Sequence, residues 1–175
     1  MQVAQGPGIP ADIAFPWFPD PHQPLTPVHT FGYAHGAHYV RGEPKVIQRA
    51  FAGHIVSAPD ELEIPARPGS PFAAFELSFV PPPGLSGAPL LSGDYRSLRG
   101  QRVAGMIVGN NTTAIQTYQS KERIEETRET TIVERYDTLY LGVAVQAASN
   151  LQMSSAMLGG TVAEFLAARQ RLVVR

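Results

Sequence analysis

Residues 71–108, PFAAFELSFVPPPGLSGAPLLSGDYRSLRGQRVAGMIV, decide the fold of this 175-residue chain. Near the start of this stretch, three apolar side chains, Phe75, Leu77 and Phe79, alternate with polar ones. Alternation at a period of two places the apolar side chains on one face of an extended segment. The pattern therefore predicts a half-buried β-strand that ends before three consecutive prolines.

Two more strands are expected in the second half of the same stretch. Leu90 and Leu91 form a short apolar segment, and Arg102–Val108 is a continuous apolar run. The glycine-rich segment between them, residues 92–101, is typical of a hairpin turn. Residues 71–108 thus predict three consecutive strands with a serine-containing loop after the first.

Further strands are expected on both sides of this stretch. Residues 46–57, VIQRAFAGHIVS, are rich in aromatic and β-branched side chains, and Tyr136–Ala147 carries aliphatic side chains at alternate positions. These aliphatic residues are Leu139, Leu141, Val143 and Val145. Glycine and proline number 16 each, well above average usage, which implies many turns between short elements. The chain is therefore expected to be all-β.

Three segments differ from this strand pattern. Residues 1–27 contain seven prolines and are expected to be a connector, because proline fixes φ and lacks an N–H. Residues 118–135 alternate charges of both signs, which predicts a solvated hairpin arm or a short exposed helix. Thr161 and Glu164 have the spacing of a capping box and predict a C-terminal helix, whose end the basic residues Arg169, Arg171 and Arg175 would suit.

The composition narrows the classes of partner. A net charge of −1 gives no general attraction to nucleic acid or to an anionic membrane. We expect no signal peptide in the first residues and no transmembrane segment, and the compartment is left open. Cysteine is absent, which excludes thiol catalysis, and His35 and His38 are interpreted as loop histidines. A small-molecule or peptide partner is therefore expected, and neither a metal nor an organic cofactor.

The chemistry of the chain is concentrated in residues 84–90, GLSGAPL. A serine hydroxyl needs a base, a group that orients the base, and N–H donors for a developing oxyanion. Glycines at 84 and 87 allow a sharp turn, so that the N–H groups of Gly84 and Ser86 can converge on one oxygen. Ser86 is therefore the candidate nucleophile.

This motif resembles the nucleophile motif of trypsin-like serine peptidases, including the bacterial HtrA-like branch. Residues 103–109, VAGMIVG, resemble the family's next core strand, and Phe31-Gly32-Tyr33 resembles a turn of its second barrel. Gly53–Ser57 also resembles a strand of that barrel, and His54 in it is interpreted as a packed or edge residue. The resemblance spans roughly residues 11–147.

The resemblance also implies roles for further residues. Ala11-Asp12-Ile13-Ala14 resembles the segment that carries the family's catalytic aspartate. Val80 would lie near the base of the specificity pocket, and Val108, Gly109 and Asn110 would flank it and offer an edge to an extended substrate. Because Val80 is not acidic, a small or medium apolar side chain is the expected preference.

The histidines depart from the family pattern. The family order is His, Asp, Ser, and all five histidines of this chain follow Asp12. Either the sequence begins inside the first barrel, as an N-terminally truncated peptidase, or the protein lacks the base and is not a peptidase. In both cases this chain alone is expected to be nearly inactive.

Two other orders of the catalytic serine, histidine and acid along the chain can be compared with this sequence. An α/β-hydrolase needs a histidine after the serine, and none follows Ser86. A subtilisin-like order is formally possible with Asp12 and one of the histidines, but the strand–helix alternation of that architecture is missing.

The resemblance implies a chymotrypsin-like double β-barrel with a complete second barrel, a partial first barrel and a C-terminal α-helix. The expected organisation is a first-barrel remnant and proline-rich connector at 1–27, a second β-barrel at 28–150 and the helix at 151–175. The expected function is a serine endopeptidase domain without its catalytic histidine. The alternative is a non-catalytic barrel that acts as a peptide-binding or structural module, and the oligomeric state is not indicated. A barrel without its neighbour would expose an apolar face, so aggregation or a completing partner is expected.

Overall fold

The computed structural model describes residues 15–34, 38–40, 43–45, 47–64, 67–94, 96, 100–123 and 130–168. Strands dominate these residues, which confirms the expected β class. Six strands close into a ring in the order β1-β4-β7-β10-β9-β8, and every neighbouring pair is antiparallel. The six are β1 (Pro27–Gly32), β4 (Arg49–Ser57), β7 (Ala74–Leu77), β8 (Pro89–Ser92), β9 (Arg102–Arg123) and β10 (Thr130–Gln146).

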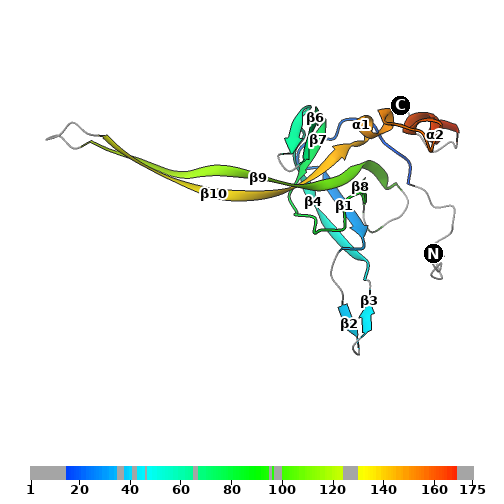
Figure 1. Cartoon of the computed structure of the whole chain (residues 1–175), viewed down its shortest axis with the longest axis horizontal. Helices are drawn as coiled ribbons and strands as arrows, with labels where there is room; N and C mark the ends of the chain where they lie inside the picture. The colour runs from blue at the N-terminus through cyan, green and yellow to red at the C-terminus, as the bar shows by residue number, and fades with distance from the viewer. Residues whose placement is uncertain are drawn as a thin grey trace.

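Smaller two-stranded sheets and two helices lie outside the ring (Figure 1). One two-stranded hairpin projects away from it, and the two short helices lie together near the C-terminal end. These elements are β2 (His38–Val40) with β3 (Glu43–Lys45), β5 (Leu62–Ile64) with β6 (Arg67–Phe72), β11 (Ser154–Ser155) with β12 (Gly160–Thr161), α1 (Ala147–Gln152) and α2 (Val162–Ala168).

The main core fills the ring, because the strands direct alternate side chains inward. It contains the fully buried residues Val28, Ile55, Phe75, Leu77, Leu85, Leu90, Ile107 and Ala144. Burial of each large apolar side chain stabilises the fold by roughly 1.5–3 kcal/mol. A second, smaller cluster joins Ala74 and Val143 to Leu62, Phe72 and Val108. Consecutive residues of β7 and of the ring part of β10, residues 141–144, are thus buried on both faces, which explains why this part of β10 is apolar.

The N-terminal connector is bound to the start of β9. Phe18 donates its N–H to the carbonyl oxygen of Val103 at 3.0 Å, and Val103 donates to Pro16 at 2.9 Å. His22 packs edge-on against Phe75 with ring centroids 5.8 Å apart. The described part of the connector, residues 15–26, therefore covers one end of the ring.

Leu90 and Leu91 are both fully buried, although they are adjacent in β8. Leu90 is opposite Gly105 and Leu91 is opposite Val103, so Ala104 is an extra residue on β9 at this point. Both faces of β8 are therefore covered next to a bulge of the neighbouring strand.

The described residues of the charged segment, 118–123 and 130–135, form a hairpin arm and not a helix. Beyond the ring β9 and β10 continue as a two-stranded ribbon that extends far from the body (Figure 1). Leu141 and Val143 are buried as the alternating pattern predicts, but Leu139 is 39% exposed because it lies on this ribbon. The tip, residues 124–129, lies outside the described residues.

The capping box of the C-terminal helix is confirmed. Thr161 donates its N–H to Glu164 Oε2 at 2.7 Å, and Glu164 donates its N–H to Thr161 Oγ1 at 3.2 Å. The helix α2 begins at Val162, and the basic residues expected at its end lie beyond the described residues. Helix α1 was not predicted from the sequence. This helix directly follows β10 in the chain, and its buried Asn150 donates a side-chain N–H to the carbonyl oxygen of Val145 at 3.2 Å.

Candidate functional site

Ser86 lies in the loop between β7 and β8, on two successive turns. Leu85 donates its N–H to the carbonyl oxygen of Pro82 at 3.3 Å, and Ala88 donates to Leu85 at 2.9 Å. Gly84 and Gly87 have φ values of 93° and 90°, a left-handed conformation that glycine adopts without strain. The two glycines therefore allow the turns that expose the Ser86 side chain.

Leu85 fixes this loop to the core. Its side chain is buried in the main cluster, whereas Ser86 and Gly87 are exposed. Gly32 at the end of β1 makes room for it, because a Cβ on Gly32 would lie 2.7 Å from Leu85 Cδ2. The Phe31-Gly32-Tyr33 turn thus packs against the serine loop. Sequence reasoning noticed this turn but missed its role as a support for Leu85.

The loop is also bound to β9. Gly87 donates its N–H to the carbonyl oxygen of Ile107 at 2.8 Å, and Ile107 donates to Ala88 at 2.9 Å. The hydroxyl of Ser86 donates to the carbonyl oxygen of Val108 at 3.3 Å. The structure therefore places the predicted nucleophile beside the predicted substrate edge.

A bulge explains why the Val108 carbonyl can meet Ser86. On β10, Ala144 is opposite Ile107 and Val143 is opposite Gly109, so Val108 is an extra residue on β9. The extra residue of a bulge is left out of the regular ladder. Its carbonyl can therefore accept the Ser86 hydroxyl.

The N–H groups of Gly84 and Ser86, which sequence reasoning assigned to an oxyanion hole, lie on an exposed part of the loop. Within the described residues neither N–H donates to a backbone or side-chain acceptor. Such donors can bind an oxygen of a ligand without first breaking a hydrogen bond inside the protein.

The other predicted substrate residues lie around the loop. Asn110 donates its side-chain N–H to the carbonyl oxygen of Pro81 at 3.2 Å, which ties the start of the arm to the serine loop. A Cβ on Gly109 would meet nothing within 4 Å, so this position borders open space. Val80 is 44% exposed in the segment that leads from β7 into the loop. The structure therefore brings Val108 to Ser86 and Asn110 to Pro81 in the same loop, and places Val80 at the start of that loop.

A second polar cluster lies where the arm leaves the ring. Glu76 accepts hydrogen bonds from Ser57 Oγ at 2.5 Å and from Asn111 Nδ2 at 3.3 Å. These residues join β4, β7 and β9. Sequence reasoning placed Glu76 on the polar face of its strand but could not find partners that are far apart in sequence.

His22 is not the base for Ser86. Its Nε2 lies 3.0 Å from Ser92 Oγ at the opposite end of β8, and burial lowers its pKa below the ordinary value. Ser92 pairs with Arg102, six residues along β9 from Val108, which corresponds to roughly 20 Å. Asp12, His35 and the side chain of His38 lie outside the described residues.

In the described part of the chain no three metal-ligating side chains come together. No helix among the same residues is long and apolar enough to cross a membrane. Comparisons with protein-family models, curated proteins and solved structures found no match. The site consists of an exposed serine side chain beside a strand edge, with two neighbouring N–H groups, those of Gly84 and Ser86, that donate to no acceptor among the described residues.

Proposed function

We propose that this chain is the nucleophile-bearing barrel of a chymotrypsin-like serine endopeptidase, with Ser86 as the nucleophile. One observation carries the proposal. The exposed Ser86 side chain lies on a glycine turn in which the N–H groups of Gly84 and Ser86 donate to no acceptor among the described residues. Its hydroxyl contacts the strand expected to bind substrate. A serine in an ordinary surface turn needs none of these features.

The proposed reaction is acyl transfer. Ser86 attacks the scissile carbonyl while a histidine takes its proton, and the same histidine returns that proton to the leaving amine. Asp12 would orient the histidine, and the amides of Gly84 and Ser86 would hold the oxyanion. In this proposal the histidine comes from a preceding segment of a longer protein, the remainder of the first barrel. The chain alone would then lose several orders of magnitude in rate.

The substrate would be a polypeptide in extended conformation, paired with the edge at Val108, Gly109 and Asn110. The absence of an acid at Val80 argues against a preference for lysine or arginine. We propose a small or medium apolar side chain before the scissile bond.

A second candidate function, peptide binding without cleavage, is supported by the position of His22. His22 is held at the far end of the ring, and the hydrogen bond recorded for the Ser86 hydroxyl goes to a backbone carbonyl. A barrel that binds a peptide at the same edge without cleaving it would also fit these contacts.

A fluorophosphonate probe separates the two functions. It should be applied to this chain and to the protein extended by any in-frame sequence upstream of Met1. The peptidase proposal predicts covalent labelling of Ser86 in the extended protein, abolished by Ser86→Ala and retained in Ser154→Ala, which changes another exposed serine. Absence of labelling in both proteins would reject catalysis and leave the binding module.

A further inference from the structure

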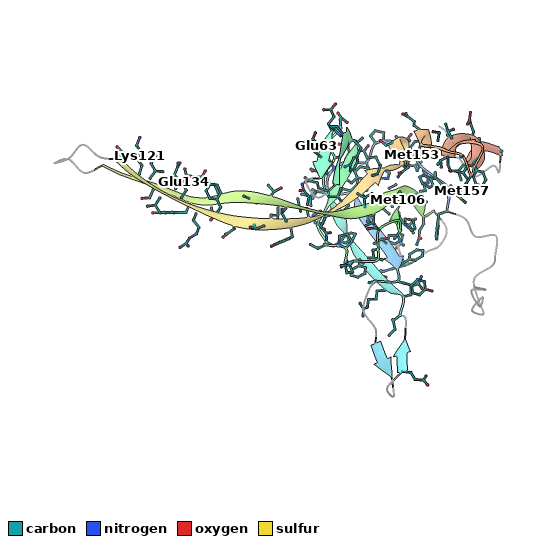
Figure 2. All side chains as sticks on the ribbon, in the orientation of Figure 1. Glu63, Met106, Lys121, Glu134, Met153 and Met157 are labelled. Atoms are coloured by element: carbon teal, nitrogen blue, oxygen red, sulfur yellow. The ribbon has the colours of Figure 1, made fainter. Side chains whose placement is uncertain are left out.

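The two-stranded arm is defined here as residues 109–123 of β9 and 130–141 of β10. Figure 2 shows Lys121 and Glu134 on it, far from the body. Seven large hydrophobic side chains on the arm are between 39% and 60% exposed, on both faces of the ribbon. They are Ile115, Tyr118, Ile132, Val133, Tyr136, Leu139 and Tyr140. A lone two-stranded ribbon is marginally stable in water, so this surface is suited to a covering partner.

The outer edge of β10 is the better place for another strand. In the ring this edge is paired with β7 from Gly142 to Val145, and beyond Gly142 no described strand pairs with it. β10 runs without an extra residue, whereas β9 carries extra residues at Val108 and Thr117. Because bulges disrupt pairing along a strand, the edge of β9 is partly blocked and the edge of β10 is not.

The direction of the free backbone groups on β10 follows from its inner end. Gln146 donates its N–H towards the β7 side, to the carbonyl oxygen of Ala73 at 3.1 Å. In a regular antiparallel strand, alternate residues direct both backbone groups to the same side. The N–H and C=O groups of Tyr136 and of the other even-numbered residues on the arm therefore face outward.

The sequence of β10 is complementary to itself in one antiparallel register. With a twofold axis at Tyr136, Arg135 is opposite Asp137 of the partner subunit, and Val133 is opposite Leu139 of the partner subunit. Ile132 is then opposite Tyr140 of the partner subunit. Opposite charges and aromatic or β-branched pairs are the cross-strand neighbours that stabilise sheets. At the remaining position, Glu134 is opposite Thr138 of the partner subunit.

The negative charge of Glu134 is compatible with this register. Its carboxylate accepts hydrogen bonds from Gln119 Nε2 at 2.8 Å and from Tyr136 Oη at 2.7 Å within its own arm. The free edge runs from Thr130 to Leu141, so a register centred on Tyr136 uses almost all of it before β7 begins.

We propose that two copies of this chain pair antiparallel along β10, from Ile132 to Tyr140, and form a symmetric dimer. The two arms then make a continuous four-stranded sheet in the order β9-β10-β10-β9, with a shared length of roughly 30 Å. An extended segment of another protein could satisfy the same backbone groups. A second copy is the occupant favoured by the residues, because it supplies the opposite charge at both central positions.

The charges provide the main test. Arg135→Asp and Asp137→Arg each place like charges opposite one another twice, and each should weaken dimerisation roughly tenfold to a hundredfold. A one-to-one mixture of the two variants restores both opposite-charge pairs, so it should form a heterodimer. The double variant with both changes should dimerise like the wild type. Sedimentation analysis from low micromolar to near-millimolar concentration measures all four samples.

Two results would overturn the proposal: a wild-type chain that stays monomeric over this range, or single variants that dimerise as strongly as the wild type. Because the mixture must recover the dimer, loss of folding in a single variant cannot be mistaken for support.

A cysteine test checks the register. The chain contains no cysteine, so a single introduced thiol can react with the same thiol of a second copy alone. In a hydrogen-bonded antiparallel pair the Cα atoms are about 5.5 Å apart, within disulfide range. Tyr136→Cys should therefore form a disulfide dimer under mild oxidation. The matched variant Thr138→Cys, which lies on the same face opposite Glu134 of the partner subunit, should not. Equal cross-linking of both would reject this register.

Discussion

The strands β9 and β10 belong to two environments, the closed ring and the open arm. Within the ring, residues 102–108 of β9 are almost all apolar, and Ala104 and Ile107 are fully buried. In the arm, residues 111–120 are mainly threonine, asparagine and glutamine, and residues 112–119 are exposed. The backbone pairing of the two strands is continuous across this change. Hydrogen bonding alone therefore does not distinguish the two regions, and the stability of the fold is expected to come from the ring.

The largest difference between the ring and the arm is expected when a large side chain is truncated in each region and the free energies of unfolding are compared. Phe75→Ala leaves a cavity in the ring and should destabilise the protein by about 3–5 kcal/mol. Tyr140→Ala removes an exposed side chain from the arm and should change the stability of the monomer by no more than about 0.5 kcal/mol. Urea unfolding measures both.

These two variants should be compared in the Arg135→Asp background, where arm pairing is weakened. Similar losses of stability in the two variants would show that the arm belongs to the same cooperative core as the ring.

A smaller contrast lies within β9 itself. A Cβ on Gly105 would clash with the carbonyl oxygen of Val145, whereas a Cβ on Gly109 would meet nothing within 4 Å. Gly105→Ala should therefore destabilise the ring by about 1–3 kcal/mol through overpacking. Gly109→Ala should be nearly neutral in the same urea experiment. If Gly109→Ala were the more destabilising, the start of the arm would be more tightly packed than the structure indicates.

Five of the six ring strands were predicted from the sequence, because periodicity and burial agree there, but β1 was not, since Phe31 and Gly32 were expected in a turn. Phe75 and Leu77 alternate with Glu76 and are fully buried in the structure. For the arm, the sequence does not decide between a hairpin and a helix, because mixed charges alone do not determine backbone conformation. Its pairing depends on Arg135 and Tyr118 meeting across the ribbon, which a local pattern does not show.

The site was predictable in part. The glycines around Ser86 indicated a turn, and both have the left-handed φ that such a turn uses. The support of the loop by Leu85 and Gly32 was not predictable, because it joins residues 53 positions apart through the core. In the proposed peptidase, the order of the histidines along the chain leads to the expectation that the base comes from elsewhere. Among the described residues, the position of His22 at the far end of the ring is compatible with that proposal.

His22, at the end of the ring that the N-terminal connector covers, should make the stability of the ring depend on pH. Burial lowers its pKa below 6.5, with smaller opposing contributions from the backbone and the charge of Asp20. The unfolded chain therefore binds a proton more readily, and stability should fall as the pH decreases below 6.5 until the folded pKa is passed. His22→Gln should remove this part of the pH dependence in urea unfolding.

Phe18→Leu is the matched control, because the ring of Phe18 packs against His22 at 5.8 Å and does not titrate. It keeps a histidine at position 22 that can titrate, so a fall of stability on acidification should be retained in this variant and lost in His22→Gln. A wild-type protein whose stability is unchanged on acidification through this range would contradict the burial of His22.

The smallest effect is expected at the capping box of α2, on the periphery of the molecule. Hydrogen bonds from the Thr161 N–H, and then from its hydroxyl, lower the pKa of Glu164 below 4.5. Because the folded pKa is depressed, the cap stabilises α2 fully above 4.5 and is lost as the pH falls through the folded pKa. An NMR titration of the Thr161 amide should therefore show a midpoint below 4.5, and Glu164→Gln should abolish it. Leu166 is the buried residue of this helix, so loss of the cap should loosen α2 locally while the ring signals stay unchanged. A midpoint at or above 4.5 would mean that the reciprocal hydrogen bonds do not persist in solution.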